Sequence, residues 1–237
     1  MKAVILAAGL GTRMQKVFSD IPKVILPIAG KPLLEHHINH LKKYGFDEFY
    51  INLHYFPEVI KNYFGDGQNF GVKIFYSYEP ELLGTAGALV NFRKYLTETF
   101  IVVYGDIFTI LNFEKMLKFH KQKKSQGTLL VHETDHPQDS DLVQVDKNRK
   151  IVRFFIYPHK KPVFGANLSS AAIYILEPET LKFLPPTPPS DFLKDFFPKL
   201  LKTGTKMYGY ESDEFTKDVG TPERYKKVKR ALESKVV

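Results

Sequence analysis

The chain of 237 residues contains no cysteine. Without thiols it can form neither a disulfide nor a thiolate metal site, as is usual for a protein of a reducing compartment. Long hydrophobic runs are missing as well. The stretch Ala3–Ala8 is far shorter than the ~20 apolar residues of a membrane span. It also follows Lys2 without the long apolar region of a secretory segment. We therefore expect a soluble, cytoplasmic protein with no membrane association.

Positive charge is in excess, with a formal net charge of +8. Many of the basic residues cluster in segments typical of exposed helix faces, such as Lys42-Lys43, Lys121 to Lys124 and Lys226 to Arg230. None of these clusters is interleaved with the aromatic side chains of a single-strand binding platform. We therefore interpret these clusters mainly as solvated surface, and we expect no nucleic-acid partner.

Apolar runs alternate with helical patterns in the first half of the chain, which is the signature of a parallel sheet with crossover helices. The expected strands are Ala3–Ala8, Glu48–Leu53, Val72–Tyr76 and Phe100–Tyr104, and the expected helices are Pro32–Tyr44, Pro57–Tyr63 and Thr85–Tyr95.

After Asp106 the pattern changes to a helix and then short strands, which predicts a smaller mixed or antiparallel sheet. These elements are a helix over Phe113–Lys124 and strands over Thr128–His132, Leu142–Val145, Ile151–Phe155 and Ala171–Leu176. Ser190 or Asp191 can cap a helix that ends near Lys202. A strand is expected at Lys206–Tyr210, and a last helix begins at Thr221-Pro222. We expect one domain over residues 1–237, with halves 1–110 and 111–237.

The first strand runs directly into a glycine loop. Its apolar residues do not alternate with polar ones, so it is expected to be buried on both faces of a parallel sheet, and ligands collect at the carboxyl ends of such strands. Gly9 and Gly11 would let backbone N–H groups approach an anion, while Arg13 and Lys23 add positive charge. The segment therefore predicts phosphate binding.

Two general phosphate-binding motifs do not fit this segment. The dinucleotide pattern G-x-G-x-x-G has Met14 at its last position, and the Gly-Lys-Ser/Thr of the Walker motif is missing. Both motifs are therefore excluded.

Other residues predict further ligand contacts. Asp106 ends the fourth expected strand with a carboxylate, and hard divalent cations prefer oxygen ligands. Gly84 permits a close approach to a base or ribose, and Thr85 opens an expected helix whose N-terminus favours anions. His36 and His40 are one helical turn apart, but two ligands are too few for a metal site, and we expect an amphipathic helix surface there.

Three segments together resemble the sugar-1-phosphate nucleotidylyltransferases, and the resemblance covers most of the chain. Leu6–Met14 with Pro22-Lys23 and Pro27 resembles the signature of that family. Glu79–Ala88, which contains Leu-Gly-Thr-Ala-Gly, is similar to the guanylyltransferase branches that use mannose 1-phosphate or D-glycero-D-manno-heptose 1-phosphate. Lys217–Pro222 matches the family's Asp-x-Gly-Thr-Pro motif.

This resemblance implies the fold and the reaction. The fold would be a three-layer α/β/α Rossmann-like nucleotidyltransferase fold, with a mainly parallel central sheet and a smaller mixed sheet on the sugar side. The reaction would join a nucleoside triphosphate, with GTP favoured, to a sugar 1-phosphate. It would give pyrophosphate and an NDP-sugar such as GDP-mannose or GDP-heptose, with Mg²⁺ as cofactor.

The resemblance also implies roles for individual residues. Nucleotide contacts fall on Leu6, Ala8, Gly9, Gly11, Thr12, Arg13, Glu79, Gly84 and Thr85. Catalysis falls on Arg13, Lys23 and Asp106, and Mg²⁺ ligation on Asp106 and Asp218. Contacts to the sugar phosphate fall on Tyr104, Gly105, Tyr157, His159, Asn167 and Ser170, although Asn167 is equally suited to capping a turn.

The sequence departs from its relatives at the sugar subsite. Many relatives carry Phe-x-Glu-Lys-Pro there, with the acid directed at sugar hydroxyls and the lysine at the sugar phosphate. Ile156 and Tyr157 replace these two residues. Because tyrosine brings no charge, His159, Lys160 or Lys161 would have to meet the phosphate dianion.

Two alternatives therefore stay open. One is a nucleotidyltransferase of similar fold with another phosphorylated acceptor, such as phosphocholine. The other is a nucleotide- or sugar-binding regulatory protein without turnover. The base, the sugar and homo-oligomer formation are open as well.

Overall fold

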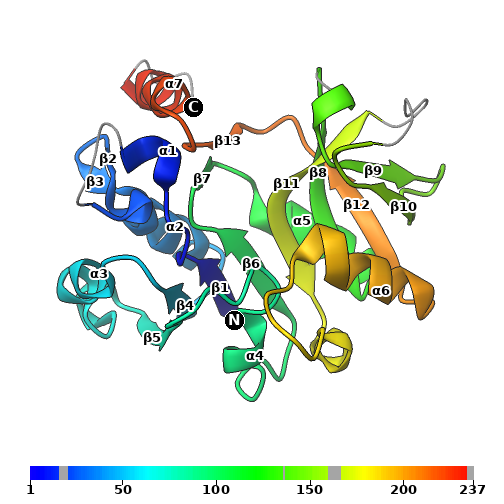
Figure 1. The fold of residues 1–237 in the computed structure, drawn as a ribbon, viewed down its shortest axis with the longest axis horizontal. Coiled ribbons are helices and arrows are strands. Elements are labelled where there is room, and N and C mark those ends of the chain that lie inside the picture. The colour runs from blue at the N-terminus through cyan, green and yellow to red at the C-terminus, as the bar shows by residue number, and fades with distance from the viewer. Residues whose placement is uncertain (16–20, 136, 160–166, 234–237) are drawn as a thin grey trace. The chain divides into compact units, whose positions relative to one another are not determined.

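The computed structural model describes residues 1–15, 21–135, 137–159 and 167–233 (Figure 1). The chain forms two compact units, and each is built from separated stretches of sequence. The first unit takes Met1–Leu82, Val103–Phe113 and the segment from Glu214 onward. The second unit takes Leu83–Val102 and Glu114–Asp213.

The first unit contains a parallel sheet. Its strands are β1 (Lys2–Leu6), β4 (Glu48–Leu53), β5 (Lys73–Tyr78) and the last two residues of β6 (Phe100–Tyr104). β4 pairs in parallel with β1 on one side and with β5 on the other, while β6 lies beside β1. Ala3, Val4 and Ile5 are completely buried, which confirms the prediction of a strand covered on both faces. The predicted strand Ala3–Ala8 is too long, however, because the chain leaves the sheet after Leu6.

Helices and two small ribbons complete the first unit. They are α1 (Thr12–Gln15), α2 (Leu33–Lys42), α3 (Pro57–Phe64) and α7 (Pro222–Glu233), with the strand pairs β2 (Pro27–Ile28) and β3 (Lys31–Pro32), and β7 (Ile107–Thr109) and β13 (Thr216–Asp218). One apolar cluster joins several of them: Met14 of α1, Leu33 of α2, Phe108 of β7 and Val228 of α7 are all buried together. This cluster holds the segments that carry the candidate site.

The second unit contains a mixed sheet. Its strands are β8 (Gly127–Glu133), β9 (Leu142–Val145), β10 (Ile151–Phe155), β11 (Leu168–Leu176) and β12 (Met207–Glu211), with the first three residues of β6 beside β11. β9 pairs antiparallel with β10 and β11, β11 pairs antiparallel with β8, and β12 runs parallel to β8. The mixed pairing expected after Asp106 is thus confirmed, and so is the α/β class of the fold.

The helices of the second unit are α4 (Leu89–Phe92), α5 (Phe113–Gln122), whose first residue belongs to the first unit, and α6 (Phe197–Lys202). Asp191 caps the turn of π-helix Phe192–Phe196 before α6, as predicted, by accepting hydrogen bonds from the backbone N–H groups of Leu193 and Lys194.

The predicted helix Thr85–Tyr95 is wrong in extent, because only the four residues of α4 are helical. The carbonyl oxygen of Ser190 accepts hydrogen bonds from the backbone N–H groups of Ala86 and Gly87. These two N–H groups therefore point at a distant segment of the chain, and the first part of the predicted helix becomes a series of turns.

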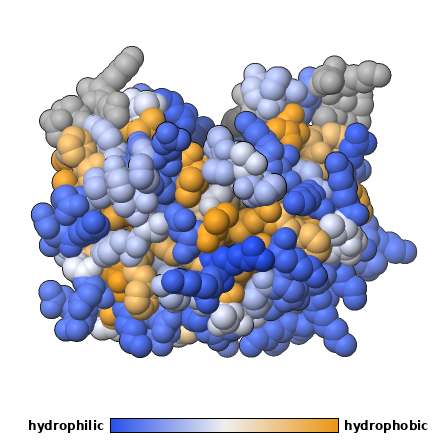
Figure 2. All heavy atoms as spheres, turned by 60° about the horizontal axis from the view of Figure 1, so that its bottom comes forward, coloured by the Kyte–Doolittle hydropathy of each residue, from blue (hydrophilic) through white to orange (hydrophobic). Residues whose placement is uncertain are grey.

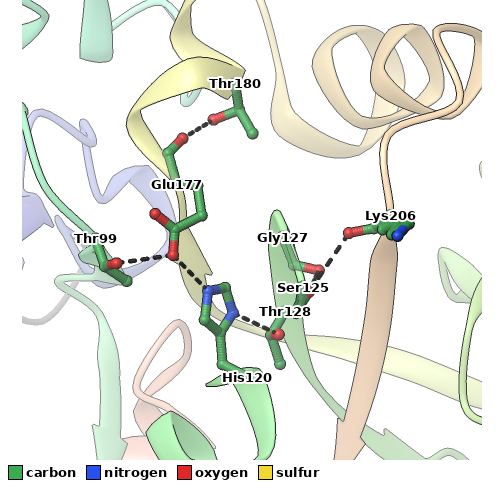
Figure 3. A network of polar contacts seen from close by, with 8 residues as sticks. All are labelled: Thr99, His120, Ser125, Gly127, Thr128, Glu177, Thr180 and Lys206. Carbon is green, nitrogen blue, oxygen red and sulfur yellow. Dashed lines mark hydrogen bonds and ion pairs between the residues drawn. The ribbon is translucent and has the colours of Figure 1, made fainter. Parts of the chain in front are cut away.

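A buried polar network ties several elements of the second unit together (Figure 3). Nε2 of His120 lies 3.0 Å from Oε1 of Glu177, and Nδ1 lies 2.8 Å from the hydroxyl of Thr128. Since a carboxylate only accepts, Nε2 carries the ring proton and the Thr128 hydroxyl donates to Nδ1. Thr99 donates to the same Glu177 oxygen at 2.7 Å. Burial lowers the pKa of His120, so the neutral ring is the form that connects α5, β8 and the end of β11.

Hydrophilic residues cover most of the face seen in Figure 2, with smaller apolar areas between them. Among the described residues, no helix combines the length and the apolar character that crossing a membrane requires.

His37 provides a test of this packing through pH. Burial lowers its pKa from 6.5 to about 4, because the charged ring would be desolvated. Below pH 6.5 the unfolded chain binds more protons at this residue than the folded chain, so the free energy of unfolding should fall as the pH drops from about 6.5 to about 4. By pH 5 the loss from this residue should be about 2 kcal/mol.

Urea unfolding of the wild type and of His37→Leu at pH 7 and pH 5 measures this contribution. For each protein, the free energy of unfolding at pH 5 is subtracted from that at pH 7. Using this difference removes the effect of the substitution on packing, which is the same at both pH values. The wild type should lose about 2 kcal/mol more than the variant, and equal losses would remove His37 as the source.

Candidate active site

The loop after β1 is held by a chain of buried amide contacts in the first unit. The backbone N–H of Ala7 donates to Oδ1 of Asn52 at 2.8 Å, and the Nδ2 of Asn52 donates to Oε1 of Glu79 at 2.9 Å. Asn52 is 3% exposed and Glu79 is 1% exposed. Glu79, predicted to contact nucleotide, therefore reaches the loop through Asn52, a residue that the sequence motifs did not reveal.

The glycine loop itself is open to solvent. Gly9 is exposed, whereas Gly11 has a φ of +63° and its carbonyl accepts the N–H of Met14 at 2.8 Å. Met14 is buried, while Thr12 and Arg13 of the same short helix are exposed. Anchoring by Met14 therefore leaves Thr12 and Arg13 on the solvent side of the loop.

Lys23 and Asp106 form an ion pair beside this loop. Nζ of Lys23 lies 2.9 Å from Oδ2 of Asp106, with side chains 15% and 31% exposed. The stem of Lys23 also packs against Gly11, where an added Cβ would lie 3.6 Å from Cε of the lysine. The first unit thus brings together the glycine loop, the lysine and the carboxylate that the sequence predicted as one site.

The ribbon of β7 and β13 brings Asp218 to the same region. Asp218 is the partner of Ile107 in this antiparallel pair, and the N–H of Val219 donates to the carbonyl of Asp106 at 2.8 Å. The two aspartates therefore lie at one end of the ribbon although 112 positions separate them in the sequence (218 − 106).

Arg224 holds the carboxylate of Asp218. Nη1 of Arg224 donates to both oxygens, at 2.9 and 2.8 Å, and the N–H of Gly220 donates to Oδ1 at 2.9 Å. A Cβ on Gly220 would come 3.3 Å from Nη2 of Arg13. Arg13 thus lies beside this turn. Arg224 was not predicted, although its place in the first turn after the Thr221-Pro222 helix start is the signal that could have indicated it.

Gly105 allows two backbone segments to meet behind the ion pair. Its N–H donates to the carbonyl of Leu6 at 2.8 Å, and an added Cβ would lie 2.7 Å from that carbonyl oxygen and 2.8 Å from Val24. The neighbouring Tyr104 ends β6 and is half-buried. Only glycine fits at position 105 without displacing the strand that leads into the glycine loop.

The second unit carries the other predicted nucleotide residues, Gly84 and Thr85. Gly84 has a φ of +80°, and an added Cβ would lie 2.4 Å from the backbone oxygen of Ser190. The hydroxyl of Thr85 donates to Oδ2 of Asp191 at 2.6 Å and accepts the N–H of Phe192 at 3.1 Å. Both residues are therefore part of a tight junction with the segment after the proline run.

Four of the predicted sugar residues belong to the second unit: Tyr157 and His159 follow β10, Asn167 precedes β11, and Ser170 lies within β11. Tyr157 is 51% exposed, and its ring meets that of His159 edge to face, with centroids 6.2 Å apart. Nε2 of His159 is buried and has no hydrogen-bond partner within the described residues. The hydroxyl of Ser170 donates to the hydroxyl of Tyr174 at 3.2 Å. Lys160 and Lys161 lie outside the described residues.

Asn167 lies in a different setting. Its Nδ2 donates to Oε1 of Glu133 at 3.2 Å, and both line a polar pocket together with the ion-paired Arg149 and Glu211. The Asn167 side chain thus has a hydrogen-bond partner within the protein. Its contact with the sugar and its capping of a turn both remain predictions.

Among the residues the structure describes, no group of three or more histidine and acidic side chains could hold a metal ion by itself. Magnesium, however, commonly takes one or two carboxylates together with substrate phosphates. Asp106 and Asp218 are 31% and 29% exposed, so both can be reached by a phosphate-bound cation. Two hard oxygen donors of this kind fit Mg²⁺.

The chain belongs to the nucleotidyl transferase family, whose sequence pattern it matches over residues 2–235. It is 33% identical to a UTP–glucose-1-phosphate uridylyltransferase of Synechocystis, covering 100% of this chain and 64% of that protein. It is also 30% identical to the mannose-1-phosphate guanylyltransferase of Mycobacterium tuberculosis, covering 94% of this chain and 62% of that protein. The chain thus spans less than two thirds of the length of these relatives.

Solved structures agree with this assignment. HddC from Yersinia pseudotuberculosis has a TM-score of 0.80 at 27% identity, covering 98% of this chain and 99% of that one. A putative glucose-1-phosphate thymidylyltransferase from Bacillus anthracis has a TM-score of 0.86 at 21% identity, covering 97% of this chain and 94% of that one. At that lower identity the likeness concerns the fold alone.

The close approach at Gly84 can be tested by stability. Gly84→Ala should lower the free energy of unfolding by about 2–3 kcal/mol, because it adds a backbone clash to an unfavourable φ. Gly204→Ala is the matched control: Gly204 has a φ of +78° but no atom within 4 Å of an added Cβ. Its cost should stay near 1 kcal/mol. Urea unfolding of both variants measures the difference, and equal losses would contradict the tight junction.

Proposed function

We propose that this chain is a nucleotidyltransferase that joins a nucleoside triphosphate to a sugar 1-phosphate, giving an NDP-sugar and pyrophosphate. The observation that carries the proposal is the ion pair of Lys23 and Asp106 next to the glycine loop, with Asp218 beside them. Family membership and relatives named as sugar-1-phosphate nucleotidyltransferases support it. We further propose that residues 1–237 act as one nucleotidyltransferase domain.

The reaction requires positioning and charge neutralisation more than covalent chemistry from the protein. An oxygen of the sugar phosphate attacks the α-phosphorus, a new P–O bond forms, and the bond from the α-phosphorus to the bridging oxygen breaks. Pyrophosphate leaves with that electron pair. The N–H groups of the Gly9–Thr12 loop would hold the phosphates, and Arg13 would neutralise the departing pyrophosphate.

Lys23 would act on the α-phosphate and the incoming phosphate. Its stem is confined by Gly11 and its ammonium is directed by Asp106, so the charge is already placed before substrate arrives. Asp106 and Asp218 would hold Mg²⁺, which when bound neutralises phosphate charge. Arg224 would keep the Asp218 carboxylate in a fixed orientation.

For the substrates we propose GTP and a mannose-type or heptose 1-phosphate. Several relatives are named as mannose-1-phosphate guanylyltransferases, and one HddC structure is described as complexed with GMP-PN. The motif Leu-Gly-Thr-Ala-Gly around Gly84 supports the same choice. The uridylyltransferase of Synechocystis makes UTP with glucose 1-phosphate the competing pair.

Substrate screening tests the proposal directly. The protein is incubated with Mg²⁺, each of the four common nucleoside triphosphates, and hexose or heptose 1-phosphates, and pyrophosphate release is measured. The expected result is release with GTP and one manno-configured sugar 1-phosphate. Release with UTP and glucose 1-phosphate would correct the substrates, and release with phosphocholine alone would select a different acceptor class. Nucleotide binding with no release for any pair would overturn the enzyme proposal.

Two substitutions test the roles of the ion pair. Lys23→Ala and Asp106→Asn should each lower kcat/KM at least about 100-fold. The first removes the ammonium aimed at the reacting phosphates, and the second removes a charge that would hold Mg²⁺ and that directs Lys23. Lys73→Ala is the matched control, since the Lys73 side chain is 72% exposed and its ion pair with Glu48 of the same unit is long, at 3.9 Å. Circular dichroism confirms folding of all three. Rates of the two site variants within threefold of the control would exclude these residues from the mechanism.

A further inference from the structure

A carboxylate of the second unit lies next to the position where the sequence lacks its expected acid. β10 ends at Phe155, whose partner in the antiparallel pair is Leu142. Asp141 precedes Leu142 directly, and its Oδ1 accepts the backbone N–H of Tyr157 at 2.8 Å. The segment 156–157 therefore has a carboxylate across from it on the neighbouring strand, although neither of its own side chains is acidic.

Contacts with the segments on both sides fix the position of Asp141. Its backbone carbonyl accepts the hydroxyl of Ser169 at 3.0 Å, and Ser169 pairs with Leu142 across β9 and β11. The side chain is anchored through Oδ1 to Tyr157. The orientation of this carboxylate is thus determined by β9, β10 and β11 together.

The second carboxylate oxygen is available. Among the described residues, Oδ2 of Asp141 accepts no hydrogen bond and meets no cation, and the residue is only half-buried. A carboxylate has about four acceptor positions, and the Tyr157 N–H fills one of them. Hydroxyl donors form short, charge-assisted bonds to such an oxygen.

The chemistry around Asp141 favours a neutral hydroxylated group over a phosphate. The one hydroxyl shown beside Asp141 within the described residues is that of Ser169, which donates to the backbone carbonyl of Asp141. A phosphate dianion would be repelled by an unpaired carboxylate, whereas a sugar ring offers the hydroxyls that it can accept. Asp141 is therefore suited to the sugar and not to its phosphate.

We propose that Asp141 is a specificity-determining residue whose free carboxylate oxygen accepts a hydrogen bond from a ring hydroxyl of the sugar 1-phosphate, in place of the acid missing at Ile156. This assignment rests on the proposed function. The competing role is purely structural, in which Asp141 only holds the turn at Tyr157 through Oδ1.

Asp141→Asn separates these two roles. Asparagine keeps an oxygen that can accept the Tyr157 N–H, but its amide nitrogen donates where the carboxylate accepted. If Asp141 only holds the turn at Tyr157, the variant should have the same sugar selectivity as the wild type. Asp213→Asn is the matched control, because Asp213 is an exposed acid of the same unit.

The experiment compares kcat/KM for the parent sugar 1-phosphate and for each of its monodeoxy analogues. In the wild type one analogue should lose about 10–100-fold, as expected for a hydrogen bond to a charged group. In Asp141→Asn the parent should fall to the level of that analogue, so that the difference between the two disappears, while the KM for nucleotide stays the same. In Asp213→Asn the wild-type difference should persist. If every analogue shows the same relative loss in Asp141→Asn as in the wild type, the assignment is overturned.

Calorimetric measurement of the affinity for the sugar 1-phosphate tests the role of Asp141 independently of the proposed reaction. Absence of turnover in the wild type would overturn the proposed reaction alone. The assignment of Asp141 would then depend on binding: wild type and Asp213→Asn should bind the parent sugar 1-phosphate about 10–100-fold more tightly than Asp141→Asn. Equal affinities in a folded Asp141→Asn protein would refute it.

Discussion

The candidate site depends on the pairing of two three-residue strands, β7 and β13. This pairing places Asp218 across from Ile107, and the N–H of Val219 bonds to the carbonyl of Asp106. Val219 is also completely buried in the cluster that holds α7. A short ribbon alone is marginal in water, so burial of its neighbours stabilises it. Loss of this register would separate two aspartates that are far apart in the sequence.

Charge in the first unit is arranged as matched pairs before any substrate is present. Lys23 pairs with Asp106, and Arg224 pairs with Asp218 through both carboxylate oxygens. Partly exposed ion pairs add little to stability. The main effect of these two pairs is therefore to orient the carboxylates of Asp106 and Asp218. A carboxylate whose direction is fixed needs no reorganisation when charge develops nearby, which is the condition for electrostatic catalysis. Arg13, beside Gly220, adds an exposed positive group next to these pairs.

The part of the site formed by neighbouring residues, the loop after β1, could be predicted from the sequence. Contacts between residues far apart in the sequence could be predicted only in outline. The unbroken apolar residues of β1 and the glycines after it predict where the loop lies, because strand burial and glycine freedom are local properties. Asn52 was missed because only the fold brings it near its partners Ala7 and Glu79. Arg224 was missed although its partner Asp218 lies six residues away in the sequence. The helix expected after Gly84 was also too long, because propensity cannot reveal that Ser190 takes its first N–H groups.

The sugar end of the reaction shows why a substitution at one position does not decide function. Ile156 and Tyr157, just after β10, stand where relatives carry an acid and a lysine, yet Asp141, just before the neighbouring β9, accepts a hydrogen bond from the backbone of Tyr157. Adjacent antiparallel strands place their residues within hydrogen-bonding distance, so a carboxylate can be supplied from either strand. The lysine has no equivalent replacement among the described residues around Asp141. The unpartnered Nε2 of His159 could contribute one hydrogen bond to a phosphate. The compensation therefore concerns recognition of the sugar ring more than binding of its phosphate.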